Sequence, residues 1–275
     1  MIRSTFQHLE GIGPRTEAFL WSWGIRTWED LRQSRSFPGM GMERVGRLHR
    51  ELQRSEEALV HGDAGYFARR LPPSEHWRLY STFASRTAFL DIETTGLYPG
   101  SCYVTVVTVH GGGETRTFVR GEDLEELGAH LRRFALLVTF NGSLFDVPFL
   151  EATFPHLPFP PAHADLRFLL RRLGQKGGLK IIEKRLGLGS RDGVEGVDGQ
   201  QSIRLWQDHL RGVRGSLKRL VAYNRADAVN LEPLLEYASR EMERRLLRIP
   251  SEEVIPDPTS ERNVDPVQLF LNRDP

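Results

Sequence analysis

The pattern of apolar and polar positions changes once along the chain. In residues 1–69, apolar side chains recur at intervals of three and four, as in "RTEAFLWSWG", "TWEDLRQS" and "GMERVGRLHRELQRSEEALVHG". This spacing puts apolar side chains on one face of a helix. We therefore predict a small all-α unit over residues 1–69.

A strand-like pattern begins at residue 87. Residues 87–94, 102–110 and 114–120 are rich in β-branched and aromatic side chains, and the turn sequences "YPGS" and "HGGG" separate them. We predict three sequential strands in an antiparallel meander, which makes Cys102 a strand residue. A helix over 122–134 and a strand over 135–141 follow, and helices dominate from residue 144 to residue 248. The predicted fold class is α/β, a mixed sheet flanked by helices.

Two segments lack a clear period. Residues 70–86 include the pair Pro72 and Pro73, which disfavours regular structure, so we predict a connector there. Residues 249–275 contain several prolines and little periodicity, and we predict an irregular tail. The predicted boundaries are thus 1–69, 70–86, 87–248 and 249–275.

Composition excludes several classes of protein. The formal charge is +1 over 275 residues, so affinity for nucleic acid has to come from local patches and not from bulk charge. The single cysteine forms no intramolecular disulfide and no thiolate zinc cluster. No apolar stretch is long enough to span a bilayer, and the first residues lack the apolar centre of a secretion signal. We expect a cytoplasmic protein without a membrane partner.

The stretch "FLDIETTGL" places two carboxylates, Asp91 and Glu93, two residues apart in a predicted strand. Side chains alternate between the faces of a strand, so both acids point the same way and crowd each other. Either solvent screens the two charges or a cation lies between them.

Two more acids lie in apolar surroundings. Asp146 stands where a predicted strand passes into a helix, and Asp227 lies inside an apolar helix. Each has a simple alternative role, because Asp146 could cap its helix and Asp227 could pair with Arg225 or Arg219.

Together, the four acids favour a different interpretation. Carboxylate oxygens are the ligands that hard divalent cations such as Mg²⁺ or Mn²⁺ prefer. Two such ions, roughly 3.5 to 4 Å apart, stabilise the attacking and the leaving oxygen of an in-line phosphoryl displacement. The acids therefore point to phosphodiester hydrolysis.

Tyr223 precedes Asp227 by four residues, which places both side chains on one helical face. A phenol with an ordinary pKa of about 10 is a poor general base near neutral pH. We therefore predict that Tyr223 orients the attacking water. The alternative is an ordinary half-buried aromatic side chain.

Three stretches, "FLDIETTGL", "TFNGSLFD" and "YNRAD", resemble in order and spacing the exonuclease motifs of the DnaQ-like 3′-5′ exonucleases. The resemblance covers about residues 87–237 and implies a ribonuclease H-like fold. It also implies that Asp91, Glu93, Asp146 and Asp227 are the metal ligands. The tyrosine subclass is implied by Tyr223, because the position at which the histidine subclass has His is Ala222 here.

Within that superfamily, "HADLRFLLRR", "GGLKIIEKRLGL" and "YNRADAVNL" look most like the YprB-type ribonuclease H-like domain. The family resemblance implies four substrate contacts: backbone near Thr94 and Thr95 at the terminal nucleotide, Leu97 against its base, and Asn141. Asp165, in "HADL", is either a fifth acid near the site or a helix N-cap, and we favour the cap.

A basic stretch follows the predicted catalytic strands. Residues 167–191 contain eight Lys or Arg and one Glu, a local excess of 8 − 1 = +7. We interpret it as a phosphate track, with a solvated helical face as the alternative. Lys176, beside two glycines that allow close backbone approach, is the preferred phosphate contact, and Lys180 is a second one.

The N-terminal stretch "HLEGIGPRTEAFLWSWGIRTWEDL" resembles a helix-hairpin-helix motif. Gly11 and Gly13 would let backbone N–H groups at a helix start bind a phosphate, and Arg15 would add charge. The alternative is a plain helical hairpin that only packs.

The sequence thus predicts a metal-dependent 3′-5′ exonuclease that uses two Mg²⁺ or Mn²⁺ ions on the 3′ ends of DNA or RNA. Two alternatives stay open. One is a non-catalytic nucleic-acid-binding module, and the other is a structure-specific endonuclease on the same fold.

Overall fold

The computed structural model describes residues 1–34, 40–191, 193, 196 and 199–247. The chain divides into two compact units, one formed by Met1–Arg70 with Glu243–Pro275 and the other by Leu71–Met242. The predicted tail over 249–275 lies outside the described residues. In the described part of the chain, no helix has both the length and the apolar character needed to cross a bilayer.

The N-terminal unit is all-helical, as predicted. Its helices are η1 (Ile2–Ser4), α1 (Pro14–Ser22), α2 (Trp28–Gln33), α3 (Met42–Val60) and α4 (Ala64–Ala68). Trp28, Leu52 and Phe67 are fully buried at its centre. A capping box formed by Thr27 and Asp30 fixes the start of α2.

The segment predicted as an irregular connector is helical instead. It forms η2 (Pro73–Leu79), α5 (Tyr80–Phe83) and η3 (Ala84–Arg86), and it belongs to the second unit. Pro73 is the first residue of η2, where the missing N–H of proline costs no hydrogen bond. Burial of Trp77 and Leu79 holds these short turns in place.

The second unit is built on a five-stranded mixed sheet with the order β3-β2-β1-β4-β5. Its strands are β1 (Thr87–Thr94), β2 (Val104–Gly111), β3 (Glu114–Val119), β4 (Leu136–Thr139) and β5 (Ala162–Asp165). The first three form the predicted antiparallel meander, while β4 and β5 run parallel to β1.

Two predictions about the strands are wrong. Helices were expected to dominate residues 144–248, but Ala162–Asp165 form the strand β5. Its four residues, "AHAD", carry too few branched or aromatic side chains to signal a strand. Cys102 precedes β2 and forms only an isolated bridge with Pro99. The turn sequence therefore extends further than expected before the second strand begins.

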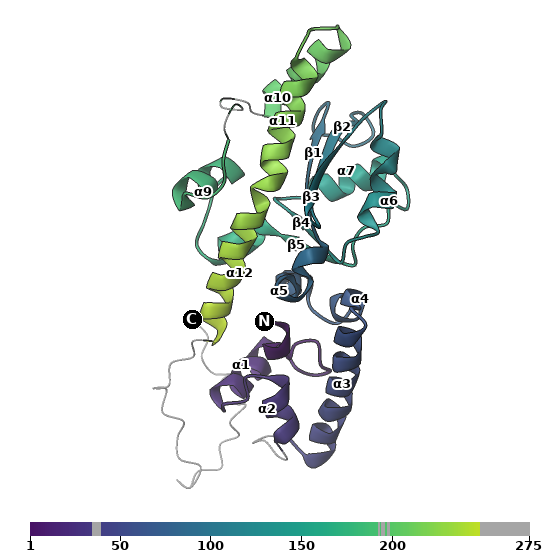
Figure 1. Cartoon of the computed structure of the whole chain (residues 1–275). Helices are drawn as coiled ribbons and strands as arrows, with labels where there is room; N and C mark the ends of the chain where they lie inside the picture. Colours follow the sequence, from purple (N-terminus) through teal and green to yellow (C-terminus); the bar gives the residue numbers. More distant parts are fainter. Residues whose placement is uncertain (35–39, 192, 194–195, 197–198, 248–275) are drawn as a thin grey trace. The chain divides into compact units, whose positions relative to one another are not determined.

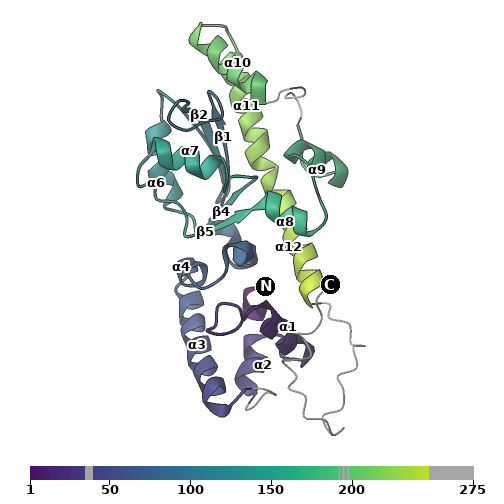
Figure 2. The same ribbon diagram turned by 180° about the vertical axis from the view of Figure 1, so that it is seen from behind.

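Helices cover both faces of the sheet (Figures 1 and 2). One face packs its apolar side chains with η4 (Leu124–Glu126), α6 (Leu127–Leu131) and α7 (Asp146–Thr153). The opposite face packs against α10 (Gly199–Leu210) and α11 (Ser216–Val229). The remaining helices are α8 (Leu166–Arg172), α9 (Leu179–Leu186) and α12 (Leu231–Leu247). This is the predicted α/β class, with a mixed sheet between helical layers.

Candidate active site

The strand β1 separates its apolar and acidic residues between the two faces of the sheet. Leu90 and Ile92 belong to the core beneath α6 and α7. Asp91 and Glu93 alternate with them and therefore face the other way. Glu93 pairs in register with Val106, whose side chain packs in the core formed with α10 and α11. The two acids thus lie on the face that α11 covers.

The helix α11 presents a polar group of side chains to this face. Leu220, Tyr223, Asn224 and Asp227 recur at intervals of three and four, and all four are buried. Such spacing normally marks an apolar stripe. Three of these four positions carry polar groups, which packing alone does not explain.

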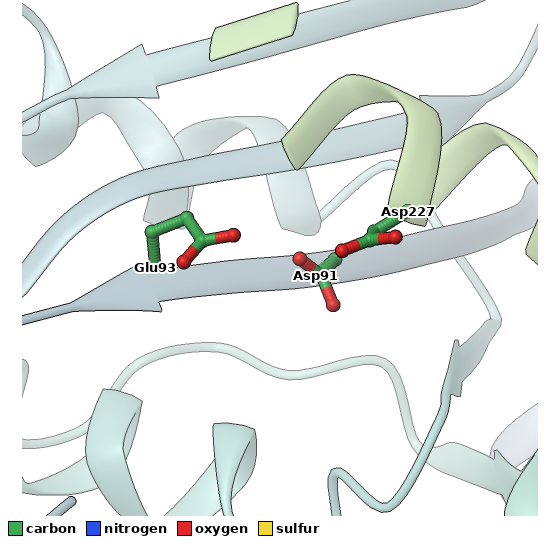
Figure 3. Close-up of side chains that lie close together, drawn as sticks. All are labelled: Asp91, Glu93 and Asp227. Carbon is green, nitrogen blue, oxygen red and sulfur yellow. The ribbon is translucent and has the colours of Figure 1, made fainter. Parts of the chain in front are cut away.

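Asp91, Glu93 and Asp227 form one cluster. A carboxylate oxygen from each lies within 4.8 Å of the others, and Figure 3 shows Asp227 of α11 beside Asp91 on the strand. Glu93 and Asp227 are buried, whereas Asp91 keeps part of its surface exposed. Three oxygen donors at this spacing, open on one side, suit a hard divalent cation.

The surroundings of the cluster disfavour the charged form of its carboxyl groups. Removal from water, and then the neighbouring Asp227, Asp146 and Glu93, raise the pKa of Asp91 well above its ordinary range. Burial is also the main reason that the pKa of Glu93 rises to about 8. Burial raises the pKa of Asp227, although Arg191 opposes the shift. A bound divalent cation would supply the positive charge that this group of acids lacks.

Asp146 lies close to this cluster without joining its three-residue core. It is the first residue of α7 and is buried, while the N-cap position belongs to Phe145. Burial raises the pKa of Asp146 to about 7, and the charges of Asp165 and Asp227 add to that shift. The side chain also accepts a hydrogen bond from the backbone of Ile92, which ties it to the acidic strand.

Sequence reasoning missed two polar groups that hold the acids. Asn224 donates from Nδ2 to Oδ2 of Asp91 over 2.8 Å, and the Ser202 hydroxyl of α10 hydrogen-bonds to Glu93. The Asn224 Oδ1 atom has no hydrogen-bond partner among the described residues. A signal for Asn224 was available, because it lies three residues before Asp227 on the same helical face. Ser202 gave no such signal.

The partner of Asp227 is Arg191, at 2.6 Å from Nη1 to Oδ1. The suggested alternatives, Arg219 and Arg225, are not its partner in the ion pairs of the described chain, and Arg225 donates to the Thr115 carbonyl instead. Arg191 lies 36 residues before Asp227, outside the local spacing that suggested the other two. Only the fold brings these two residues together.

Tyr223 is buried beside the cluster and hydrogen-bonds to Asp227. Burial and then the charge of Asp227 raise its pKa, so the phenol keeps its proton. The Lys180 ammonium lies 4.6 Å from the centre of the Tyr223 ring, and its charge lowers the pKa of Glu93. Lys180, predicted as a phosphate contact, therefore lies at the acidic cluster.

The residues predicted to meet the terminal nucleotide lie at the ends of β1 and β4. Thr94 ends β1 and donates to the Gly96 carbonyl, while Thr95 exchanges hydrogen bonds with Tyr103. The Leu97 side chain is 68% exposed.

The loop after β4 holds Asn141 in a left-handed conformation, with φ at 68°. Asp165 accepts hydrogen bonds from the backbones of Asn141 and Ser143, and the Asn141 side chain accepts one from Arg167. Asp165 also caps α8 through the Arg167 backbone, which confirms the favoured cap role.

The basic stretch over 167–191 is partly neutralised inside the protein. Arg191 pairs with Glu183 and Asp227, and Arg172 pairs with Glu75. The side chains that remain exposed include Arg171, Lys176, Lys184 and Arg185. The cationic surface is therefore smaller than the sequence count of +7 implied.

The glycines of the predicted hairpin lie in the segment that leads into α1. Gly11 has a φ of 73° and its carbonyl accepts from Arg44, while Gly13 is the N-cap residue of α1. Arg15 is exposed on the first turn of that helix. A cavity of about 690 Å³ lies beside the hairpin, and its lining includes both glycines, Arg54 and Arg70.

Comparison with known proteins identifies the family of the second unit. The model of the RNase H superfamily matches residues 88–239, more than half of the chain. No curated protein matches.

Solved structures that match the chain include the family B DNA polymerase of Pyrobaculum calidifontis, with a TM-score of 0.44 and 17% identity over 56% of this chain. The chain spans only 25% of that polymerase. The Aedes aegypti Nibbler EXO domain gives a TM-score of 0.41 and 14% identity, over 63% of this chain and 91% of that domain. Brucella melitensis NrnC with bound Mg²⁺ gives 0.31 and 20%, over 60% of this chain and 89% of that one.

Proposed function

The chain belongs to the RNase H superfamily, and from this premise we propose that it is a metal-dependent 3′-5′ exonuclease acting on DNA or RNA. One observation carries the proposal. Three carboxylates from two distant segments, Asp91, Glu93 and Asp227, converge at one face of the sheet with oxygens within 4.8 Å of one another. With Asp146 beside them, they are the proposed ligands of two Mg²⁺ or Mn²⁺ ions. These ions, when bound, supply activation of the attacking water and stabilisation of the leaving 3′ oxygen.

The chain's own groups orient the reactants. Tyr223 keeps its phenolic proton, because burial and the neighbouring carboxylates raise its pKa. We assign it the role of positioning the attacking water by hydrogen bonding, together with the carboxylate of Glu93. Lys180 lies against the Tyr223 ring, where its ammonium group is suited to an oxygen of the scissile phosphate.

Four of the proposed substrate contacts, at Thr94, Thr95, Leu97 and Asn141, follow from the family resemblance. Exposed Leu97 suits the face of the terminal base, with the backbone of Thr94 and Thr95 and the Asn141 side chain beside the sugar and phosphate. Lys176 would follow the phosphate backbone further along the strand. In the N-terminal unit, the α1 start at Gly13, with Gly11 and Arg15, suits a sequence-independent phosphate contact.

The test is a cleavage assay with 5′-labelled DNA and RNA oligonucleotides, with Mg²⁺ and with Mn²⁺. Stepwise shortening from the 3′ end is the expected result. One internal cut would instead identify a structure-specific endonuclease, and binding without metal-dependent cutting would identify a non-catalytic module.

A paired set of variants links activity to the site. Asp227→Ala is expected to abolish cutting, whereas Glu126→Gln, which removes an exposed charge paired with Arg116, is expected to preserve it. Full activity of Asp227→Ala would remove the assignment of the site.

A further inference from the structure

Arg191 joins the acidic cluster to a second buried carboxylate. Its Nε and Nη2 atoms donate to Glu183 over 2.5 and 2.8 Å, and its Nη1 lies 2.6 Å from Oδ1 of Asp227. The Glu183 side chain is only 6% exposed. One guanidinium thus bridges two buried carboxylates, one of which is a proposed metal ligand.

The bridge is anchored from two helices. Glu183 lies in α9, and its Oε1 also accepts from Nδ2 of Asn230, the residue that follows α11. Asn230 further exchanges hydrogen bonds with the backbone of Ser190, next to Arg191. The backbone beside Arg191 is therefore fixed relative to the end of α11, the helix that carries Asp227.

The arrangement leaves Asp227 one oxygen that Arg191 does not occupy. Two parallel N–H···O bonds fix the plane of the guanidinium on Glu183, so Nη1 reaches Asp227 in a defined direction. Glu183 offsets part of the Arg191 charge, so the bridge repels a divalent cation less than an unpaired guanidinium would. An ion-pair partner held in a fixed place beside a ligating carboxylate orients it and tunes its affinity for the metal.

We propose that Arg191, held by Glu183, is a positioning residue that orients the Asp227 carboxylate for a divalent cation. This inference rests on the proposed function, because it needs Asp227 to be a metal ligand. The competing idea is that Arg191 occupies the metal's place and is displaced on binding. The two ideas predict opposite changes in metal affinity.

The experiment measures Mn²⁺ binding to the 275-residue chain without substrate, from the electron paramagnetic resonance signal of free Mn²⁺. Arg191→Gln is expected to weaken binding by about ten- to a hundredfold, the range for lost partners of metal ligands. Glu183→Gln is expected to act in the same direction, because Arg191 then loses its anchor. Arg172→Gln is the matched control, since Arg172 pairs with buried Glu75 in the same unit and its loss is expected to leave Mn²⁺ affinity unchanged.

The double variant Arg191→Gln with Glu183→Gln guards against misfolding, because it leaves neither partner of the Arg191–Glu183 pair as a lone buried charge. Circular dichroism checks its fold, and we expect weakened Mn²⁺ binding as in the single variants. Unchanged or tighter binding by the folded variants overturns the positioning role while leaving the metal site intact. Absence of Mn²⁺ binding by the unaltered protein overturns the proposed function itself.

Discussion

Asn224 of α11 donates a hydrogen bond from Nδ2 to Oδ2 of Asp91 in β1, over 2.8 Å and across 133 positions of sequence. Asn224 is completely buried. The bond ties the helix that carries Asp227 to the strand that carries Asp91 and Glu93. The acidic cluster is thus held together by a neutral amide even when no cation neutralises it.

Removal of this amide is expected to destabilise the protein. Asn224→Ala should lower the free energy of unfolding by about 1–3 kcal/mol, because it leaves the partly buried Asp91 carboxyl group without its donor. Asn224→Asp should lower it further in metal-free buffer, since it adds a like charge beside Asp91. Urea unfolding followed by circular dichroism measures both. Gln53→Ala is the control, because Gln53 makes an exposed amide-to-carboxylate bond with Glu57, and equal losses in the two alanine variants would contradict the role of Asn224.

Divalent cations are expected to raise the melting temperature. At a hundredfold excess of Mg²⁺ or Mn²⁺ over Kd, binding to the folded state alone adds about 2.7 kcal/mol. Asp91→Asn should lose most of this shift, whereas Glu126→Gln, which removes an exposed charge paired with Arg116 outside the cluster, should keep it. Differential scanning fluorimetry with and without EDTA provides the measurement. A shift of the same size in Asp91→Asn would mean that the cation binds elsewhere.

Stability of the metal-free protein is expected to fall as the pH rises toward 8. Burial raises the pKa of Glu93 to about 8 and that of Asp146 to about 7, from ordinary values of 4.5 and 3.8. Between the ordinary and the raised pKa, the folded state binds more protons than the unfolded state, so the free energy of unfolding decreases with pH. The stability that these two raised pKa values contribute is complete below about pH 4 and is lost as the pH passes through 7 to 8.

Urea unfolding in EDTA at several pH values between 4 and 8.5 measures that slope. Glu93→Gln should flatten it, because the amide does not titrate. Saturating Mg²⁺ should also reduce the loss at high pH, since metal binding favours the deprotonated carboxylates. A slope that Glu93→Gln leaves unchanged would assign the pH dependence to other groups.

Tyr223→Phe is expected to slow cleavage without weakening metal binding. The variant keeps the ring against Lys180 but loses the hydroxyl that bonds to Asp227. We expect kcat to fall by roughly a hundredfold through loss of positioning, with Mn²⁺ affinity little changed. Single-turnover cleavage measures the effect on the rate, and Mn²⁺ titration measures the effect on metal affinity. Tyr66→Phe is the control, because it removes a hydroxyl that hydrogen-bonds to Ser55 in the N-terminal unit. Wild-type kcat in Tyr223→Phe would exclude the orienting role.

Arg15 and Lys176 are expected to contribute charge and no base specificity. Replacement of either by alanine should weaken binding of unrelated oligonucleotides to a similar degree and reduce the salt slope of the affinity by about one. Fluorescence anisotropy at several salt concentrations measures this slope. Glu29→Ala, which removes an exposed side chain of α2 in the same unit, serves as a control for surface substitution. An unchanged slope for Arg15→Ala would leave the hairpin with a packing role.

The sequence alone determined the class of fold and the chemistry of the acids. Alternation in β1 put Asp91 and Glu93 on one face of the strand, and helical spacing put Tyr223 and Asp227 on one face of their helix. Both relations depend only on local backbone geometry. Periodicity also separated the all-α unit from the α/β unit. Side-chain placement within one strand or one helix does not depend on how that element packs against the rest of the chain.

Only the tertiary structure decided which groups meet across the sheet. The short β5, the bond from Ser202 and the Arg191 bridge between Glu183 and Asp227 have no signature in local spacing. Helical spacing marks Asn224 as a neighbour of Asp227, but it does not identify Asp91 as its hydrogen-bond partner. Each depends on how strands pair and on where α9, α10 and α11 pack, and that packing is set by burial over the whole domain. The sequence could therefore nominate the ligands, whereas the groups that hold them in place became visible only in the folded chain.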